Sequence, residues 1–329
     1  MRKRRVLGPP GATYHCISRV YDRKFLLRPA ACKKKFREIM LREAEFRGVE
    51  ILTYCIMDNH WHIQVTVPPR PNFSDAELAA RYRIRYGPDR ENEILATLRE
   101  LRGHGSEKSL KKYRNRLLAQ LHDLSQFMKA LKQNFSNWYN RRHGRKGTLW
   151  EKRFTSVLVE GRGEALKTIA AYIDLNPVRA GMVSDPKDFG WSGYGAAVGG
   201  NKAARAGIAT IMSEHASPSE SLAAYRLLIF GAGEEKGECG ERSRIRKGFT
   251  REEAARVYEA EGRLTFGQLM SCRVRYLVDG AILGSRDFVE RMYKRNRKTL
   301  GRKRKTIGTK VPLAHANITS LRNFSHPLE

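Results

Sequence analysis

The chain has 329 residues, enough for one large or two modest domains, and no apolar stretch is long enough to cross a membrane as a helix. Its 63 Lys and Arg residues against 34 Asp and Glu residues give a formal net charge of +29, more than solubility requires. This excess favours a polyanionic partner, because each neutralised phosphate of a nucleic acid releases counterions. No apolar signal core follows the basic N-terminus, so we expect a cytoplasmic protein that makes no membrane contact.

The cysteines are five in number and include no close pair. An odd, dispersed set argues against a disulfide framework and against a cysteine-based zinc site. Reduced, buried thiols are the expected state of Cys16, Cys32, Cys55, Cys239 and Cys272.

The first predicted elements follow the order strand, helix, strand, strand. Residues 13–20 alternate polar side chains with β-branched and aromatic ones, as in a strand. Residues 30–47 carry apolar side chains at helical spacing, and Gly48 ends this helix. Further strands are predicted over residues 49–57 and 60–67.

A charged insertion follows, over about residues 70–123. It contains few large apolar side chains, which predicts solvated helices, and a DNA-contacting role for it stays open. Residues 124–142 then form a clearer amphipathic helix, in which an aromatic stripe faces the core. A strand over residues 155–160 and a helix over 164–175 complete an α+β layered domain.

This domain covers residues 1–195, and the rest of the chain is less regular. Residues 196–248 are predicted to be a linker with one helix near 219–230. Residues 249–300 are expected to form a small all-α module, followed by a basic disordered tail over 301–329. Three short helices and a basic run favour a helix-turn-helix-like DNA-binding module, with a packing appendage as the alternative.

Two histidines stand out in the sequence Asp58-Asn59-His60-Trp61-His62-Ile63-Gln64. Successive side chains on a strand point to opposite faces, so His60, His62 and Gln64 share one face and Trp61 faces the core. The two imidazoles are then spaced to hold one divalent metal. The spacing also suits a zinc hydrolase, or two exposed histidines with no ligand.

A second candidate half-site lies near residue 172. Tyr172 and Asn176 are four residues apart and lie on one helix face, if the helix reaches Asn176. Asn176 offers a neutral carbonyl oxygen as a third ligand. Two imidazoles and one amide oxygen suit Mg²⁺ or Mn²⁺ that also contacts a phosphate.

The phenol of Tyr172 is the candidate nucleophile. A phenol with a pKa near 10 is only about 0.1% ionised at neutral pH, so it needs a more reactive electrophile. A metal supplies this by drawing charge from the non-bridging phosphate oxygens. Attack on a DNA phosphodiester would give a covalent phosphotyrosine and a free hydroxyl, which is transesterification rather than hydrolysis.

These residues resemble a known family. His60-Trp61-His62 fits the HUH motif, and Tyr172 to Gly181 looks like the corresponding stretch of single-tyrosine HUH transposases, with Tyr-x-x-x-Asn-Pro-Val as in the REP-associated branch. The segment from Gly11 to Arg19 and the segment from Gly147 to Phe154 also resemble that branch. The resemblance covers about residues 8–195.

The resemblance implies a ferredoxin-like antiparallel sheet with helices, the HUH nuclease fold. It implies that Tyr172 is the nucleophile, that His60 and His62 are metal ligands and that Asn176 is a third ligand. The implied substrate is single-stranded DNA with hairpins or palindromes, cleaved and rejoined in the cytoplasm of a bacterium, at the nucleoid, by a monomer or homodimer. The long insertion and the C-terminal module depart from the compact members.

Several alternatives remain. A domesticated descendant could mainly bind structured DNA or RNA. A rolling-circle initiator or relaxase would use the same histidine pair, although the stretch after Tyr172 fits the transposases better. The candidate nucleic-acid contacts are Arg19, Lys129, Lys132, Arg141, Arg142, Arg153 and Arg179.

Overall fold

The computed structural model describes residues 5–215, 217–231, 277, 280–300, 308–311 and 317–322. The strands are β1 (Ala12–Arg19), β2 (Glu50–Ile56), β3 (His60–Val67), β4 (Thr155–Val159), β5 (Gly280–Gly284), β6 (Thr309–Lys310) and β7 (Thr319–Arg322). The helices are α1 (Ala30–Arg47), α2 (Asp75–Tyr86), α3 (Pro88–Gly103), α4 (Glu107–Leu118), α5 (Leu124–Arg142), α6 (Gly163–Asp174), α7 (Asn176–Arg179), α8 (Gly193–Val198), α9 (Lys202–Ile211), α10 (Pro218–Gly231), α14 (Arg286–Arg295) and α15 (Arg297–Leu300). Short 3₁₀ turns cover Tyr21–Arg23 and Pro186–Asp188.

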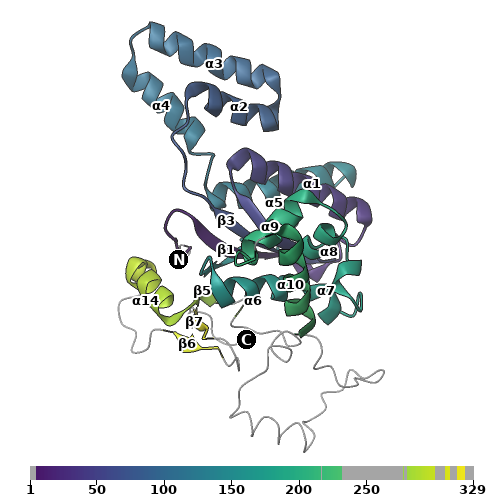
Figure 1. Ribbon diagram of the computed structural model, residues 1–329. Coiled ribbons are helices and arrows are strands. Elements are labelled where there is room, and N and C mark those ends of the chain that lie inside the picture. Colours follow the sequence, from purple (N-terminus) through teal and green to yellow (C-terminus); the bar gives the residue numbers. More distant parts are fainter. Residues whose placement is uncertain are drawn as a thin grey trace, which may run out of the picture.

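The described strands form one sheet in the order β2-β3-β1-β4-β5-β7-β6 (Figure 1). Its first four strands, with α1 and α5, run β1-α1-β2-β3-α5-β4 along the chain and pair antiparallel throughout. Helices α1 and α5 contact each other and pack into the same core cluster, so they cover one face of the sheet. This is the split βαβ arrangement of a ferredoxin-like fold, and the predicted fold class is confirmed.

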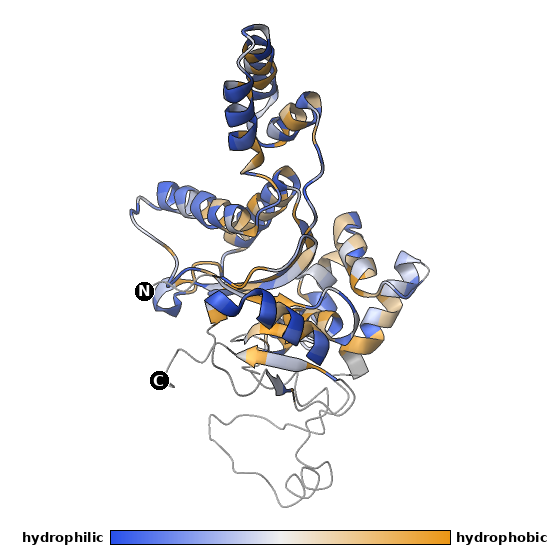
Figure 2. Cartoon of the chain, turned by 90° about the vertical axis from the view of Figure 1, so that its left-hand side faces the viewer, coloured by the Kyte–Doolittle hydropathy of each residue, from blue (hydrophilic) through white to orange (hydrophobic). Residues whose placement is uncertain are grey.

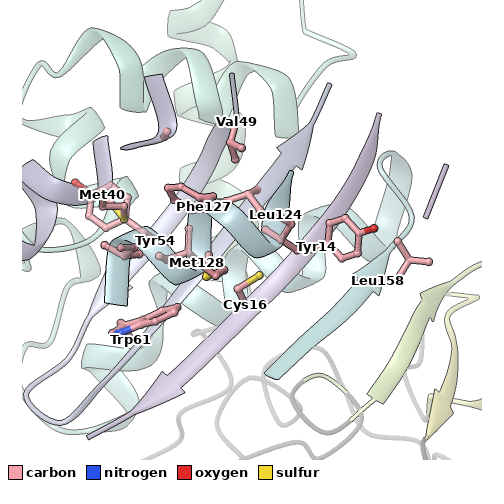
Figure 3. Packing of buried hydrophobic residues seen from close by; sticks show 14 of the residues in the cluster. Tyr14, Cys16, Met40, Val49, Tyr54, Trp61, Leu124, Phe127, Met128 and Leu158 are labelled. Atoms are coloured by element: carbon pink, nitrogen blue, oxygen red, sulfur yellow. The ribbon is translucent and has the colours of Figure 1, made fainter. Parts of the chain in front are cut away.

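The two faces of β3 separate the core from the candidate site. Trp61 is fully buried, and it packs with Phe36 of α1 at 5.6 Å between ring centroids. Figure 3 shows Trp61 on this face, together with Cys16 of β1 and Met128 of α5. The intervening side chains of β3 therefore point to the other face, which α6 covers.

The insertion forms a helical unit of its own. Helices α2, α3 and α4 project from the sheet and carry many hydrophilic residues (Figure 2). They enclose a separate apolar cluster, which Phe46 of α1 joins. The carboxylate of Glu43 on α1 is fully buried and pairs with Arg85 of α2, so a buried ion pair ties this unit to the domain.

The chain after residue 195 differs from its prediction. Helix α10 forms where the sequence predicted a helix, but α9 was not predicted, and both pack into the core beneath α6 instead of forming a linker. Gly207 of α9 approaches β2 so closely that an added Cβ would lie 2.2 Å from the carbonyl oxygen of Leu52. Burial of Ile208 and Tyr225 explains this packing, since each removes a large apolar surface from water.

The described part of the C-terminal region is not all-α. Strand β5 pairs parallel with β4, and β7 and β6 extend the sheet antiparallel, so residues predicted as module and tail complete one sheet. Helix α14 forms as predicted, with the Ser285 hydroxyl accepting from the amide of Phe288. The first part of the predicted all-α module, residues 249–276, lies outside the described residues, as do Cys239 and Cys272.

Two bulk predictions can be compared with the described residues. Cys16, Cys32 and Cys55 are free and buried, as expected for reduced thiols. No helix in the described ranges has both the length and the apolar character needed to span a bilayer.

Candidate active site

Three histidines and one tyrosine meet on the face of the sheet that α6 covers. His60 and His62 come from β3, and their ring centroids lie 5.1 Å apart. His15 comes from β1, and its ring lies 5.1 Å from that of His62. Tyr172 of α6 lies 5.9 Å from His62 and 6.2 Å from His15 between ring centroids. The structure therefore brings the predicted nucleophile to the predicted histidine pair.

A chain of hydrogen bonds fixes the tautomer of His62. His15 Nδ1 lies 3.1 Å from the carbonyl oxygen of Leu277, which can only accept, so His15 Nδ1 carries the proton. In neutral His15, Nε2 is then the acceptor, and it lies 2.9 Å from His62 Nδ1. His62 Nδ1 must donate this bond, which leaves the lone pair of His62 on Nε2.

The same reasoning applies to His60. The amide nitrogen of Asn59 donates to the carbonyl oxygen of Arg23 at 3.1 Å, which fixes the orientation of the Asn59 side chain. Asn59 Oδ1 is therefore the atom that accepts from His60 Nδ1, at 2.7 Å. Both histidines of the HUH motif thus hold a proton on Nδ1 and a lone pair on Nε2, the state in which an imidazole binds a metal.

Burial keeps this cluster neutral. Desolvation lowers the pKa of His15 from 6.5 to about 4. Desolvation also lowers the pKa of His62 well below its usual value, and the neighbouring His15 and His60 lower it further. At neutral pH both imidazoles are therefore uncharged and keep the lone pairs that the hydrogen bonds assign.

Arg179 covers the ring of Tyr172. Its guanidinium lies 4.0 Å from the ring centroid, and Nη2 donates to the carbonyl oxygen of Tyr172 at 2.8 Å. Tyr172 is only 3% exposed, so a phosphate reaches the phenol only after covering side chains shift. A cation at this position would stabilise negative charge on the phenol or on a phosphate beside it.

Asn176 lies at the end of the same helical segment. Its amide nitrogen donates to the carbonyl oxygens of Tyr172 and Ile173, at 3.0 and 3.2 Å, and so caps the last turn of α6. These bonds identify which atom is nitrogen, so the carbonyl oxygen of Asn176 is not used in the cap.

Asp174 anchors the helix that carries Tyr172. Its carboxylate is fully buried and accepts from the hydroxyls of Thr53 at 2.8 Å and Tyr225 at 2.7 Å, and from the amide of Tyr194 at 3.1 Å. Desolvation raises the pKa of Asp174 to about 6 despite these bonds. The three donors belong to β2, α10 and α8, so α6 is held from several sides.

The residues present fit a divalent metal only with a mixed ligand set. His15 Nε2 is used by His62 Nδ1, and no group of three His, Cys, Asp or Glu side chains in the described part of the chain could hold a metal ion. A third protein ligand would therefore be another donor, such as the amide oxygen of Asn176. Gln64, on the same face as the histidines, also has a buried Oε1 without a hydrogen-bond partner. Imidazole and oxygen ligands of this kind suit Mn²⁺ or Mg²⁺ better than a thiolate-binding metal.

Two of the seven predicted DNA contacts lie at the candidate site, and four lie together on α5. Arg19 pairs with His60 across β1 and β3 and lies at the site, and Arg179 covers Tyr172. Arg153 precedes β4, and the other four residues, all on α5, lie in the layer on the opposite face of the sheet: Lys129, Lys132, Arg141 and Arg142. Lys132 is half-buried there, and desolvation together with Arg153 lowers its pKa to about 8. These α5 residues are therefore not part of the cluster around Tyr172.

His15 and Asp174 are the site residues that sequence reasoning missed. No second histidine lies two residues from His15 on β1, so the sequence shows no pair there. His15 comes next to His62 only because β1 pairs with β3 in the register Ile17↔His62. One signal was available, since β1 alternation puts His15 on the same face as Arg19.

The comparisons with known proteins agree with the motif. Residues 10–78 match the family described as "Transposase IS200 like". This part of the chain resembles the IS200-like transposases. The matched segment includes His15, His60 and His62 and ends before Tyr172. It confirms the predicted resemblance for this fifth of the chain, and a search of curated proteins found no match.

One solved structure is also similar. It is a REP-associated tyrosine transposase bound to a REP hairpin, and it aligns with 61% of this chain and 87% of its own at 17% identity and a TM-score of 0.39.

Proposed function

We propose that this protein is a metal-dependent transposase that cleaves and rejoins single-stranded DNA near hairpins through a phosphotyrosine at Tyr172. The observation that carries the proposal is the 5.9 Å between the rings of Tyr172 and His62, where His62 presents a lone pair on Nε2. The candidate nucleophile and the candidate metal ligand His62 lie 110 residues apart in the sequence, and their proximity in the fold supports the proposal. The match over residues 10–78 supports the same class of protein.

The reaction follows from the residues of the site. The phenolic oxygen of Tyr172 forms a bond to phosphorus, and the bond from phosphorus to one deoxyribose oxygen breaks. The phenolic proton passes to water, and the leaving oxygen takes up a proton to become a hydroxyl. One phosphodiester replaces another, so the strand can be rejoined by the reverse reaction.

The side chains around Tyr172 have separate roles in this reaction. Arg179 stabilises the charge that develops on the phenol and the phosphate. His60, His62 and the oxygen of Asn176 would hold Mg²⁺ or Mn²⁺, which when bound withdraws charge from the non-bridging phosphate oxygens. Asp174 holds α6 so that the phenol stays beside His62.

The test uses single-stranded hairpin oligonucleotides taken from palindromes flanking the coding region, incubated with Mn²⁺ and run on denaturing gels. Wild-type protein should give a cleaved strand and a covalent protein–DNA adduct. Tyr172→Phe should lose both and keep binding, whereas Tyr86→Phe, a change at a tyrosine 51% exposed on α2, should keep both. Cleavage by Tyr172→Phe would contradict the proposal. Binding without cleavage by the wild type would favour a structured-DNA binding protein.

A further inference from the structure

A second basic site lies where α14 ends. A hollow of about 670 Å³ is lined by Leu7 and by residues 294–299. Helix α14 packs through Val289 and Met292 into the core cluster of α1 and α5. Tyr172 packs into the other cluster, on the opposite face of the sheet. The hollow is therefore separate from the candidate active site.

The hollow is lined by four cations and no carboxylate. Lys294, Arg295, Arg297 and Lys298 are all exposed. Within the described ranges, none of the four forms an ion pair with an acidic side chain. Four like charges within five residues repel one another, so binding of an anion there relieves an unfavourable interaction.

The wall of the hollow is fixed before any ligand arrives. Asn296 is buried, and its carbonyl oxygen accepts from the amide of Leu7 at 2.9 Å. Its amide nitrogen donates to the carbonyl oxygen of Leu7 at 2.9 Å and to that of Met292 at 3.0 Å. The N-terminal segment and the end of α14 are thus joined, and the exposed cations on either side of Asn296 line the same hollow.

We propose that this hollow binds phosphodiester groups of the nucleic-acid substrate, at nucleotides outside the reacting centre. Its volume is in the range of sites that hold a nucleotide-sized ligand. Arginine presents a planar fork that matches two phosphate oxygens, and lysine adds a mobile point charge. The identity of the ligand as DNA rests on the proposed function. The inference gives the predicted C-terminal DNA-binding role a defined position among residues that the structure describes.

The experiment compares two double variants that remove the same charge. Lys294→Gln with Arg297→Gln changes the hollow, and Lys111→Gln with Lys112→Gln changes exposed cations of α4. Binding of a fluorescein-labelled hairpin single strand is measured by anisotropy over a range of salt concentrations, after the melting temperature shows that each variant is folded. Loss of two phosphate contacts should lower the slope of log K against log salt by about 1.4 and weaken binding about tenfold near 0.15 M salt. The α4 variant should change neither quantity.

Single-turnover cleavage at saturating DNA should be unchanged in the hollow variant, because no substituted residue touches the reacting atoms. If both double variants bind the hairpin equally weakly, the effect is due to net charge and the proposal is overturned. Unchanged hairpin affinity in the hollow variant would also overturn it. Stabilisation by inorganic phosphate through the same residues, without an effect on oligonucleotide affinity, would also overturn it. The proposal for the hollow is tested by hairpin affinity alone, whereas the proposed function is tested by cleavage with Tyr172→Phe, so the two can fail independently.

Discussion

Replacement of His15 tests the hydrogen-bond chain that orients His62. In His15→Leu, the buried proton on His62 Nδ1 loses its acceptor, and His62 is no longer held in the tautomer that exposes Nε2. In His15→Gln, the side-chain oxygen can take the place of His15 Nε2 and accept the same bond. The two variants therefore differ in the presence of one acceptor.

The expected effect follows from the cost of an unpaired buried donor, about 1–3 kcal/mol. At about 1.4 kcal/mol for each factor of ten, this predicts that His15→Leu weakens Mn²⁺ binding by about 10- to 100-fold, the usual range for partners of metal-bound histidines. His15→Gln should stay close to the wild type.

The assay is titration of Mn²⁺, with free Mn²⁺ followed by electron paramagnetic resonance, which needs no DNA and no turnover. His15→Gln is the matched control, because it keeps an acceptor for His62 Nδ1 and leaves the contact between Asn59 and His60 unchanged. Equal Mn²⁺ affinity in His15→Leu and wild type would refute the reasoning. Equal weakening in His15→Leu and His15→Gln would show that the shape of the imidazole matters rather than its acceptor.

Three further outcomes are expected. The pKa of His15 is lowered to about 4 in the folded state, so its neutral form stabilises the fold above pH 6.5, and this stability is lost as the pH falls toward 4. His15→Gln should therefore lose less free energy of unfolding than wild type between pH 7 and pH 4.5, by up to about 3 kcal/mol. Urea unfolding at the two pH values measures this difference. Arg179→Gln should lower single-turnover cleavage by about 100-fold with little change in DNA affinity, measured by rapid-quench kinetics, and an unchanged rate would remove Arg179 from the mechanism. Glu43→Ala should lower the free energy of unfolding by about 3 kcal/mol, because the buried guanidinium groups of Arg47 and Arg85 lose their carboxylate. Glu38→Gln, a change at the surface, should lower it by less than about 1 kcal/mol.

The pH comparison needs the variant because Asp174 acts in the opposite direction. Its pKa is raised to about 6, so its protonated form stabilises the fold at low pH and this stability is lost as the pH rises through 6. In the wild type the contributions of Asp174 and His15 oppose each other between pH 4 and 6. The difference between wild type and His15→Gln removes the contribution of Asp174, which both proteins share.

The ferredoxin-like core was predictable because its elements carry local patterns. The alternation of residues 60–67 assigned Trp61 to the core and both motif histidines to the other face, and β3 has this arrangement. Helices α1 and α5 were predicted with their observed bounds, since each has a regular apolar stripe and a clear end. Where the spacing of apolar residues and the residues that end a helix agree, the bounds of the helix can be predicted from the sequence alone.

The rest could not be predicted because it depends on contacts between distant segments. Strand β7 has four residues, and it forms only because β5 offers an edge next to β4. The place of His15 depends on the register of β1 against β3, which no local pattern states. The composition of α9 and α10 did not show that Ile208 and Tyr225 would be buried. In each case the deciding interaction is tertiary, so local propensity carries little information.

The anchoring of Asp174 changes where the domain that carries the candidate site ends. Tyr172 lies two residues before Asp174, and the carboxylate accepts hydrogen bonds from Thr53 of β2, next to the motif strand. Its other donors, Tyr194 and Tyr225, come from α8 and α10, on either side of the predicted boundary at residue 195. A chain cut at that boundary would leave a buried carboxylate without the Tyr225 hydroxyl, and it would expose the apolar face against which α9 and α10 pack. The helices predicted as part of a linker therefore hold Tyr172 against the histidine pair, and the smallest unit able to keep this geometry extends at least through α10.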